Sequence, residues 1–522
     1  MKLKLTTMVR LVIFVIVLAV LGTAAYFGYP LIKDKLPGKS DAVSGKSSTV
    51  SGDIGGTAAN LHASDGNNVI NLSLDEWVGY RTIVKANGGF ETQPGSIFDR
   101  HGLKVNISVI NDPDQSSNAL ISGSLDAAGY TLNRVAFLSD KFKQAGAEIV
   151  FPVFTNYSSG GDGIIARTGI NNVTDLVGKK IGVPRFGESH AMLIWFVNNS
   201  DLSDAEKREI IDNLILFESA SDTGEAFYAG KLDVAATWQP YLSNALDGDD
   251  CHIMFSTASS KTLVMSGVAF RKDFAEANPE LVTEFIDAIF EANDEPETDY
   301  MYLKNVMPMF ADSSDEEIKA QFKDAEMTGY AENKKILSET APNMYATMCG
   351  IWESIGETTD RKAGLSMFDD SYVNRLSGQY SSTVVQKDKP SEMTEEKKKQ
   401  IMNYDSLLSK SMTLEFVADS ALFVDPEAAY ETMDEFVEIA DTLTGAIIQI
   451  EGNINSSNTT ESGKALSLER ANAVAKYFAA CGIDPNRIIT VGNGNTKMKV
   501  DPSSADASAN RRTDVFFKII EE

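Results

Sequence analysis

An arginine and an amide lie 15 residues apart near the C-terminus of the chain. Asn455 follows a short apolar stretch, IIQIEGN, and Arg470 lies in LSLERANAVAKYF, which has the apolar spacing of an amphipathic helix. A guanidinium in the first turns of a helix can hold a carboxylate through charge-assisted hydrogen bonds. The side chain of Asn455 offers hydrogen bonds but no charge. The pair therefore predicts a binding site whose second contact is neutral.

A second set of side chains follows stretches that read as strands in the N-terminal half of the chain. Aromatic and hydroxyl groups predominate among them: Trp77, Tyr80, Thr131, Ser189, Trp238 and Tyr241. Ligands of α/β proteins bind at the carboxyl ends of strands, so this set predicts a small-molecule site. Structural interpretations remain open, since tryptophans also form cores and a serine such as Ser189 also caps helices.

Two other residues in this half of the chain, Asp162 and His190, give weaker evidence of a site. Asp162, in SSGGDGII, is in a context that is more often a turn than a site. His190 has no histidine or cysteine at metal-ligand spacing, so no metal site is predicted. Motifs such as GxSxG, HExxH or a P-loop are absent from the sequence, which predicts a protein that is not an enzyme and needs no cofactor.

Composition narrows the class of protein further. The formal charge of −27 argues against nucleic acid as a partner, because such binding needs a basic surface. The three cysteines, Cys251, Cys349 and Cys481, lie far apart and predict no disulfide framework. At 522 residues the chain is long enough for about three structural units.

The N-terminus predicts a membrane anchor over residues 1–36. Residues 11–32 form a run of 22 residues without a charge, long enough as a helix to cross a bilayer. Basic residues precede this run, so the remainder is expected outside the membrane. A cleaved signal peptide is the alternative, because small residues at 23–25 offer a cleavage site.

Two linkers divide the rest of the chain. Residues 37–66 are rich in glycine, serine and alanine, and residues 379–411 are polar and charged. Between them, over residues 67–378, strand-like and helix-like stretches alternate, which predicts parallel sheets with crossover helices. The last unit covers residues 412–522 and mixes strands with two amphipathic helices.

Stretches of the first unit, including DLVGKKIGVPRFGESH and AGKLDVAATWQPYL, resemble the substrate-binding proteins of nitrate, taurine and alkanesulfonate ABC transporters. The resemblance covers about residues 68–378 and implies a two-lobed type II periplasmic-binding-protein fold with the ligand between the lobes. It implies that the strand-end residues above line the site, together with His190, and that Gly161 and Asp162 lie at its edge. The ligand class does not carry over, since such proteins bind nitrate, sulfonates, bicarbonate or pyrimidine-like molecules. With Arg185 close to a helix start, which attracts anions, we expect a small anion such as a sulfonate.

The series LSLERANAVAKYF, GIDPNRI, GNG and NRR resembles the OmpA-like peptidoglycan-binding domain, an α+β fold, over about residues 412–522. In that family an aspartate and an arginine together hold the diaminopimelate of the peptide stem. Arg470 matches the arginine, and Asn455 stands where the aspartate is expected.

The resemblances together imply a single-pass membrane protein with its bulk outside the cytoplasm. It would capture a small solute for an ABC permease and hold peptidoglycan. The alternative is a wall-anchored scaffold or sensor whose binding-protein domain engages a protein partner.

Overall fold

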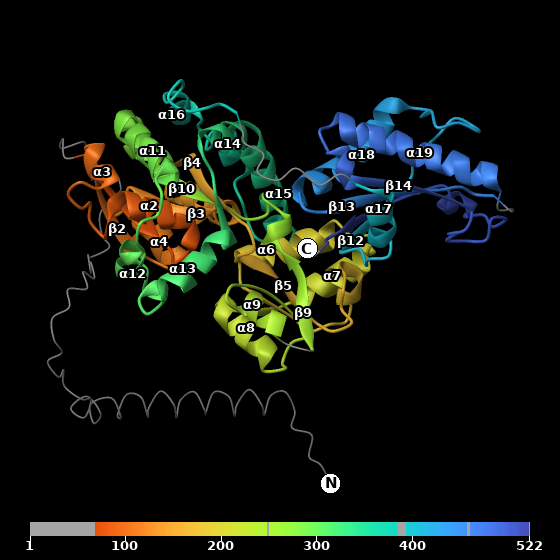
Figure 1. Ribbon diagram of the computed structural model, residues 1–522, viewed down its shortest axis with the longest axis horizontal. Coiled ribbons are helices and arrows are strands. Elements are labelled where there is room, and N and C mark those ends of the chain that lie inside the picture. The colour runs from red at the N-terminus through yellow and green to blue at the C-terminus, as the bar shows by residue number, and fades with distance from the viewer. Residues whose placement is uncertain (1–67, 248–249, 384–392, 457–459, 521–522) are drawn as a thin grey trace, which may run out of the picture. The chain divides into compact units, whose positions relative to one another are not determined.

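The computed structural model describes residues 68–247, 250–383, 393–456 and 460–520 (Figure 1). The predicted anchor at 1–36, with its membrane span at 11–32, and the first linker at 37–66 lie outside this range. Among the described residues, every helix is too short or too polar to cross a membrane.

The first lobe is built on a six-stranded sheet in the order β11-β4-β10-β3-β1-β2. Its strands are β1 (Val69–Leu74), β2 (Lys104–Val109), β3 (Ala127–Thr131), β4 (Ile149–Ser158), β10 (Met265–Arg271) and β11 (Ala325–Met327). Helices pack around it: α2 (Arg81–Asn87), α3 (Ile97–Arg100), α4 (Pro113–Ser122), α5 (Leu132–Ala145), α10 (Lys272–Ala277), α11 (Pro279–Asp294), α12 (Met301–Val306), α13 (Asp315–Gln321), α14 (Tyr330–Lys335) and α16 (Ser371–Asn374).

The second lobe is built on a five-stranded sheet in the order β7-β6-β8-β5-β9. Its strands are β5 (Asp162–Arg167), β6 (Ile181–Pro184), β7 (Ile215–Phe217), β8 (Val234–Trp238) and β9 (Cys251–Ser256). Its helices are α6 (Glu188–Asn198), α7 (Asp204–Asp212), α8 (Ala220–Tyr228) and α9 (Tyr241–Asn244). The chain crosses between the lobes twice, from β4 to β5 and from β9 to β10.

The prediction of parallel sheets is only partly correct. β1 pairs in parallel with β2 and β3, and β6 with β7 and β8, as crossover helices require. The strands next to the two crossings, β4, β5, β9 and β10, pair antiparallel with their neighbours instead. The reason is that a strand entering a sheet from the other lobe runs against the strands that the crossover helices align.

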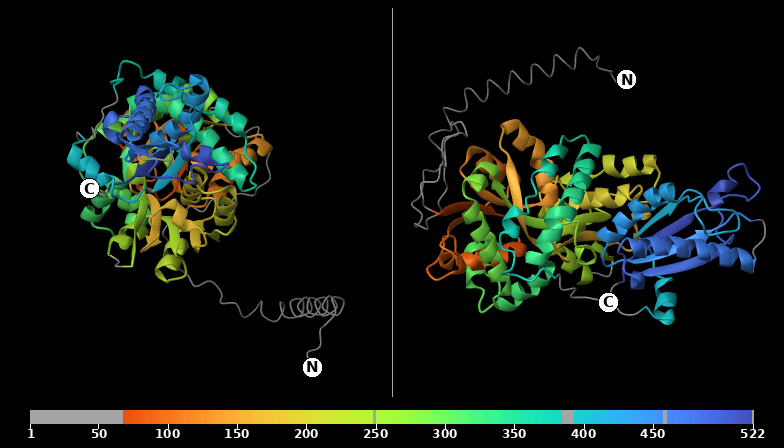
Figure 2. Two further views of the ribbon diagram at one scale, coloured as in Figure 1. Left: turned by 90° about the vertical axis from the view of Figure 1, so that its right-hand side faces the viewer. Right: turned by 90° about the horizontal axis from the view of Figure 1, so that it is seen from above.

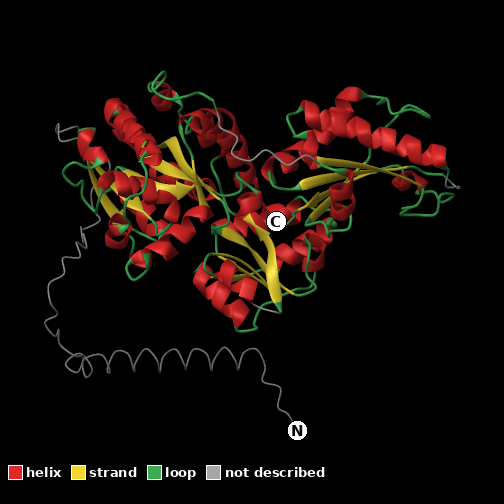
Figure 3. Ribbon diagram, viewed as in Figure 1, coloured by secondary structure: helices red, strands yellow, loops and turns green. Residues whose placement is uncertain are grey.

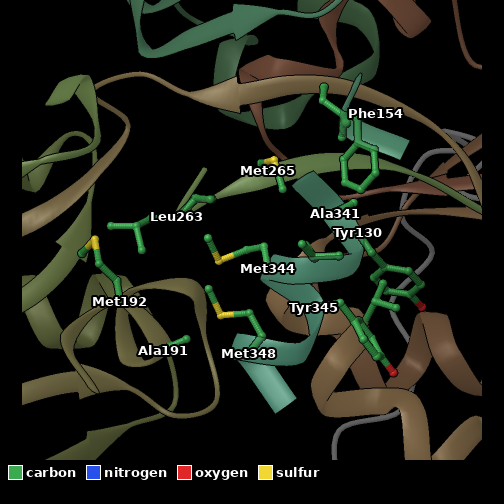
Figure 4. Close-up of a cluster of buried hydrophobic side chains, with 14 of the residues drawn as sticks. Tyr130, Phe154, Ala191, Met192, Leu263, Met265, Ala341, Met344, Tyr345 and Met348 are labelled. Atoms are coloured by element: carbon green, nitrogen blue, oxygen red, sulfur yellow. The ribbon is translucent and has the colours of Figure 1, made fainter. Parts of the chain in front are cut away.

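Helix α15 (Ala341–Ser354) joins the cores of the two lobes. It packs against α5 of the first lobe and α6 of the second. Figure 4 shows Met344 and Met348 of this helix on the side where Met192 of α6 and Leu263 lie, with Tyr345 and Tyr130 of β3 on the other side. Methionine side chains fill irregular gaps and adapt to small displacements, so the buried contact between the lobes is a deformable one.

The C-terminal domain is a four-stranded sheet, in the order β12-β15-β13-β14, with helices packed on it (Figures 2 and 3). The strands are β12 (Leu408–Met412), β13 (Ile447–Asn453), β14 (Ile488–Gly494) and β15 (Thr513–Lys518), and the two long helices are α18 (Pro426–Thr442) and α19 (Glu461–Ala480). β12 begins inside the predicted second linker, at 379–411, because its residues pair with β15 from Leu408 onward. The short helix α17 (Glu395–Ile401) also joins this domain, since Lys518 Nζ donates to the carbonyl of Ile401.

Candidate functional site

Trp77 connects the end of β1 to the crossing between the lobes. Its indole N–H donates to Asn156 Oδ1 at 2.9 Å, within β4. Its ring lies against Gly161, in the turn between β4 and β5, where an added Cβ would come within 2.2 Å of a ring carbon. A glycine at 161 is therefore required by the tryptophan, and the structure brings together two of the predicted site residues.

Thr131 connects β3 of the first lobe to α6 of the second. Its hydroxyl caps α5 by accepting from the Arg134 backbone N–H at 3.4 Å, and it donates to Glu188 Oε1 at 2.7 Å. The guanidinium of Arg134 lies 3.7 Å from the same carboxylate of Glu188, in the first turn of α6. Contact between the lobes at this point is therefore polar and partly ionic.

Two buried carboxyl groups flank this contact. Asp162 is 4% exposed and opens β5, where Oδ2 accepts from the Ser158 hydroxyl at 2.8 Å. Asp75 follows β1, and its Oδ1 is enclosed although the residue as a whole is half-buried. Burial, with Glu188 adding to it, raises the pKa of both aspartates from 3.8 to about 7.

Several polar atoms around these acids have no hydrogen-bond partner among the described residues. They are Asp75 Oδ1, Asp162 Oδ1 and Ser189 Oγ. Ser189 is 0% exposed, so solvent does not satisfy it, whereas the buried hydroxyl of Tyr80 has that of Ser266 as a neighbour. Buried polar atoms of native proteins are ordinarily paired, and an unpaired set of this kind marks groups held ready for another partner.

The remaining predicted residues, Trp238, Tyr241 and His190, have different surroundings. Trp238 is 41% exposed and stands opposite Asp162 on the neighbouring strand β8. The ring of Tyr241 packs against Gly224 of α8. His190 is buried beside Trp352, and its Nδ1 accepts from the Phe186 backbone N–H at 3.2 Å. Burial lowers the pKa of His190 to about 4, so its ring is neutral.

The sequence-based prediction missed Asp75, Arg134 and Glu188. Both acids stand close to predicted residues: Asp75, in LDEWVGY, directly follows β1, and Glu188, in FGESHAML, begins α6 after β6. Acidic residues at strand ends were a usable signal, but the pairing of Glu188 with Thr131 and Arg134 depends on how the two lobes meet.

One further group of ligand-type side chains lies on the first lobe. Ligand atoms of His101, Glu284 and Asp287 lie within 4.8 Å of one another. The two ring nitrogens of His101 are already bonded, to Glu284 at 2.8 Å and to Glu291 at 2.9 Å. Those carboxylates raise the pKa of His101 against the opposing effect of its burial. The group is thus explained as an ion-pair cluster that ties α3 to α11.

The C-terminal domain contains a separate pocket of about 370 Å³. Its lining includes Phe416, Asn453, Arg470, Arg511 and Arg512. Arg470 is half-buried there, with its guanidinium 4.7 Å from the centre of the Phe416 ring and Nε donating to the Ser420 carbonyl at 3.0 Å. Arg512 is ion-paired with Asp514 at 2.9 Å, whereas Arg511 is exposed. The pocket is therefore basic.

Asn455 lies outside the residues that line this pocket. Its Oδ1 accepts from Asn510 Nδ2 at 3.1 Å, and its Nδ2 donates to the Pro502 carbonyl at 3.4 Å. The amide is thus held by the loop that precedes β15. Arg470 and Asn455 remain predicted site residues, and the structure places only Arg470 in the pocket.

Two family matches accompany this geometry. Residues 96–295 match the family described as NMT1/THI5 like, and residues 416–512 match the OmpA family. Proteins of Brucella abortus (strain 2308) and Brucella suis biovar 1 (strain 1330), named as binding proteins with no ligand stated, are 29% identical over 202 residues. The match covers 38% of this chain, and the chain spans 59% of the length of these relatives.

Solved structures of sulfonate-binding proteins are also similar. The periplasmic aliphatic sulphonate binding protein from Escherichia coli is 16% identical, with a TM-score of 0.46 over 58% of this chain and 99% of its own. The alkanesulfonate-binding protein from Xanthomonas axonopodis pv. citri is 17% identical, with a TM-score of 0.43 over 56% of this chain and 95% of its own. At these TM-scores the likeness carries no argument about a ligand.

The two family matches fall on the two parts of the chain that the sequence distinguishes, and neither family is enzymatic. The chain therefore combines a substrate-binding domain of the NMT1/THI5-like family with a C-terminal domain of the OmpA family.

Proposed function

We propose that this protein is an extracytoplasmic solute-binding protein of the ABC-import type, which captures a small solute between its two lobes and delivers it to a permease. The observation that carries the proposal is the unpaired polar set between the lobes. Asp75 comes from the first lobe, and Asp162 and Ser189 come from the second. A solute bound among them would pair groups from both lobes at once, which is how a two-lobed receptor couples binding to closure.

An anionic group of the solute fits the start of α6. The first N–H groups of a helix are unsatisfied within it and favour negative charge. The Ser189 hydroxyl is buried at this helix start without a hydrogen-bond partner among the described residues. Arg185, which the sequence suggested as a further contact, instead lies over the Phe186 ring at 4.6 Å. Ser189 and the helix start, rather than Arg185, support the anionic contact.

We propose further that the C-terminal domain holds peptidoglycan through the basic pocket around Arg470. The guanidinium of Arg470 keeps N–H donors available, because its hydrogen bonds to the described residues use Nε and one long contact of 3.5 Å from Nη2 to the Val417 carbonyl. Arg511 adds a second positive charge to the same lining. A carboxylate of the wall peptide is the group that such a pocket would bind.

An N-terminal segment that anchors the chain in the membrane completes the proposal. Its support is the uncharged run at residues 11–32 in the sequence. A receptor held at the membrane and at the wall would stay close to its permease.

Solute capture is tested by the melting temperature of the full-length chain. A panel of sulfonates, oxyanions, amines, amino acids and other small metabolites is added one at a time. We expect at least one compound to raise the melting temperature in the wild type and to do so less in Ser189→Ala, which removes only a hydroxyl. If the whole panel leaves the melting temperature unchanged, the transport function loses its support and a scaffold role is favoured.

Wall binding is tested separately with purified sacculi. The full-length chain and its Arg470→Ala variant are sedimented with sacculi, and the fraction retained is compared. Lys476→Ala is the matched control, because Lys476 is an exposed cation on the same helix and outside the pocket lining. Equal retention of all three proteins would make the domain a spacer.

A further inference from the structure

The charges between the two lobes are predominantly negative. Asp75, Asp162 and Glu188 bring three carboxyl groups together, and the guanidinium of Arg134 acts on Asp75 and Glu188. The grouping is established by contact as well as by charge. Glu188 bonds to Thr131 and faces Arg134 across the lobes, and Asp162 adjoins Gly161, on which the Trp77 ring rests.

The positive charge of Arg134 is already paired with the carboxylate of Glu188. Its guanidinium lies 3.7 Å from Glu188, which also accepts a hydrogen bond from Thr131 at 2.7 Å. Asp75 Oδ1 and Asp162 Oδ1 are left buried without a hydrogen-bond partner among the described residues. Ionised carboxylates in such surroundings are costly unless a cation or several donors reach them.

Acidic surroundings extend beyond these two side chains. In addition to burial, the negative charges of Glu188 and Glu76 raise the pKa of Asp75. Those of Glu188 and Asp324 likewise add to burial in raising the pKa of Asp162. A purely anionic solute placed here would meet repulsion from each of these groups. A positive charge would instead be attracted by all of them and would donate to both unpaired oxygens.

Aromatic faces lie beside the acids. The Trp77 ring covers Gly161, which directly precedes Asp162. Trp238, which is 41% exposed, stands across the strand pair from Asp162. Tryptophan is the strongest aromatic partner of a cation, so both rings add to the same preference.

We propose that the solute carries a positively charged nitrogen, held by the unpaired oxygens of Asp75 and Asp162 from opposite lobes. This inference rests on the proposed solute capture and defines the solute class: a protonated amine or other nitrogen cation. An anionic group elsewhere on the solute, at the start of α6, is compatible with it and would make the solute zwitterionic.

The test uses matched compounds and isothermal titration of the full-length chain. Each probe series contains an aminoalkanesulfonate, the alkylamine of the same chain length and the alkanesulfonate that lacks the amine, in the ethyl, propyl and butyl series. Amino acids, polyamines and quaternary ammonium compounds are added, each with its hydroxyl analogue. We expect binding to follow the basic nitrogen.

Substitutions locate the contact. Asp75→Asn and Asp162→Asn keep the shape of the side chains and remove the charge, and we expect each to weaken the binding of the nitrogen compounds by about tenfold or more. Asp312→Asn is the control, since Asp312 is an exposed aspartate before α13 and outside this group. Its affinity should equal that of the wild type.

The outcomes separate this inference from the broader function. Binding of compounds that lack a basic nitrogen, with affinity unchanged in Asp75→Asn and Asp162→Asn, would overturn the inference and leave solute capture standing. If no compound of the panel binds, both the inference about the cation and the proposed solute capture are refuted. If the alkylamines bind as tightly as the aminoalkanesulfonates, the contact with a nitrogen cation is supported and the proposed anionic contact at α6 is refuted.

Discussion

Replacing Asp162 by asparagine is expected to change how the stability of the substrate-binding domain depends on pH. The carboxyl is 4% exposed, so solvent screens it little, and burial raises its pKa from 3.8 to about 7. A raised pKa means that the stability contributed by the group is fully present below 3.8 and is lost as the pH rises through about 7. The variant carries no ionisable group at 162 and escapes this loss.

The size of the effect follows from the shift. Each pKa unit corresponds to about 1.4 kcal/mol, so the loss for the wild type has an upper limit of about 4 kcal/mol at pH 8. At pH 5 the loss is already about 1.5 kcal/mol. The stability of Asp162→Asn relative to the wild type should therefore rise by about 2–3 kcal/mol from pH 5 to pH 8. Taking the difference between two pH values cancels any fixed cost of the substitution, such as a weaker bond from Ser158.

Denaturant unfolding followed by tryptophan fluorescence is the appropriate assay. The four tryptophans of the chain are Trp77, Trp195, Trp238 and Trp352, all within the substrate-binding domain. The signal therefore reports on that domain and not on the C-terminal one. Asp312→Asn again serves as the control for a change in net charge. If Asp162→Asn and the control show the same pH dependence as the wild type, Asp162 is not the buried, unpaired acid described above.

Three further predictions concern other parts of the molecule. Gly161→Ala places a Cβ at 2.2 Å from the Trp77 ring, so it should destabilise the domain by about 1–3 kcal/mol in the same unfolding assay and lower solute affinity; unchanged values would mean that the ring is free to move. The affinity for a nitrogen cation should fall from pH 8 to pH 5.5, because the two buried aspartates take up protons below pH 7; titration calorimetry showing equal affinity at both pH values would contradict this. Asn455→Asp should leave retention on diaminopimelate-containing sacculi unchanged, because position 455 lies outside the pocket lining and its amide is held by Asn510 and Pro502; a gain of about tenfold that depends on Arg470 would instead place the residue at the ligand.

Much of the fold could be predicted from residue patterns because those patterns are local. The alternation of strands and helices over residues 67–378 and the amphipathic helix that carries Arg470 follow from periodicity. The antiparallel pairing of β5 and β10 could not be predicted, because it results from the two crossings between the lobes. β12 was assigned to a linker for a similar reason, since its polar residues become a strand only by pairing with β15.

The candidate site was likewise predictable only where local sequence patterns determine it. Trp77, Thr131 and Asp162 were identified from their positions after strands or in a turn, and the structure places them near one another through Gly161 and Glu188. Its electrostatic character was not predictable, because it depends on which carboxylates find a partner across the lobes. Asp75 and Asp162 lie in polar stretches of the sequence. Only the packing of the two lobes encloses them and leaves one oxygen of each unpaired.

The central claim, that the solute binds between the two lobes, is tested most directly by hydrogen–deuterium exchange of the full-length chain with and without a bound compound. The account predicts slower exchange on binding in three segments: the turn that carries Asp75, the crossing at Gly161 and Asp162, and the first turn of α6. The pocket around Arg470 should be unaffected. Protection confined to the C-terminal domain, or to the outer helices of either lobe, would contradict the account.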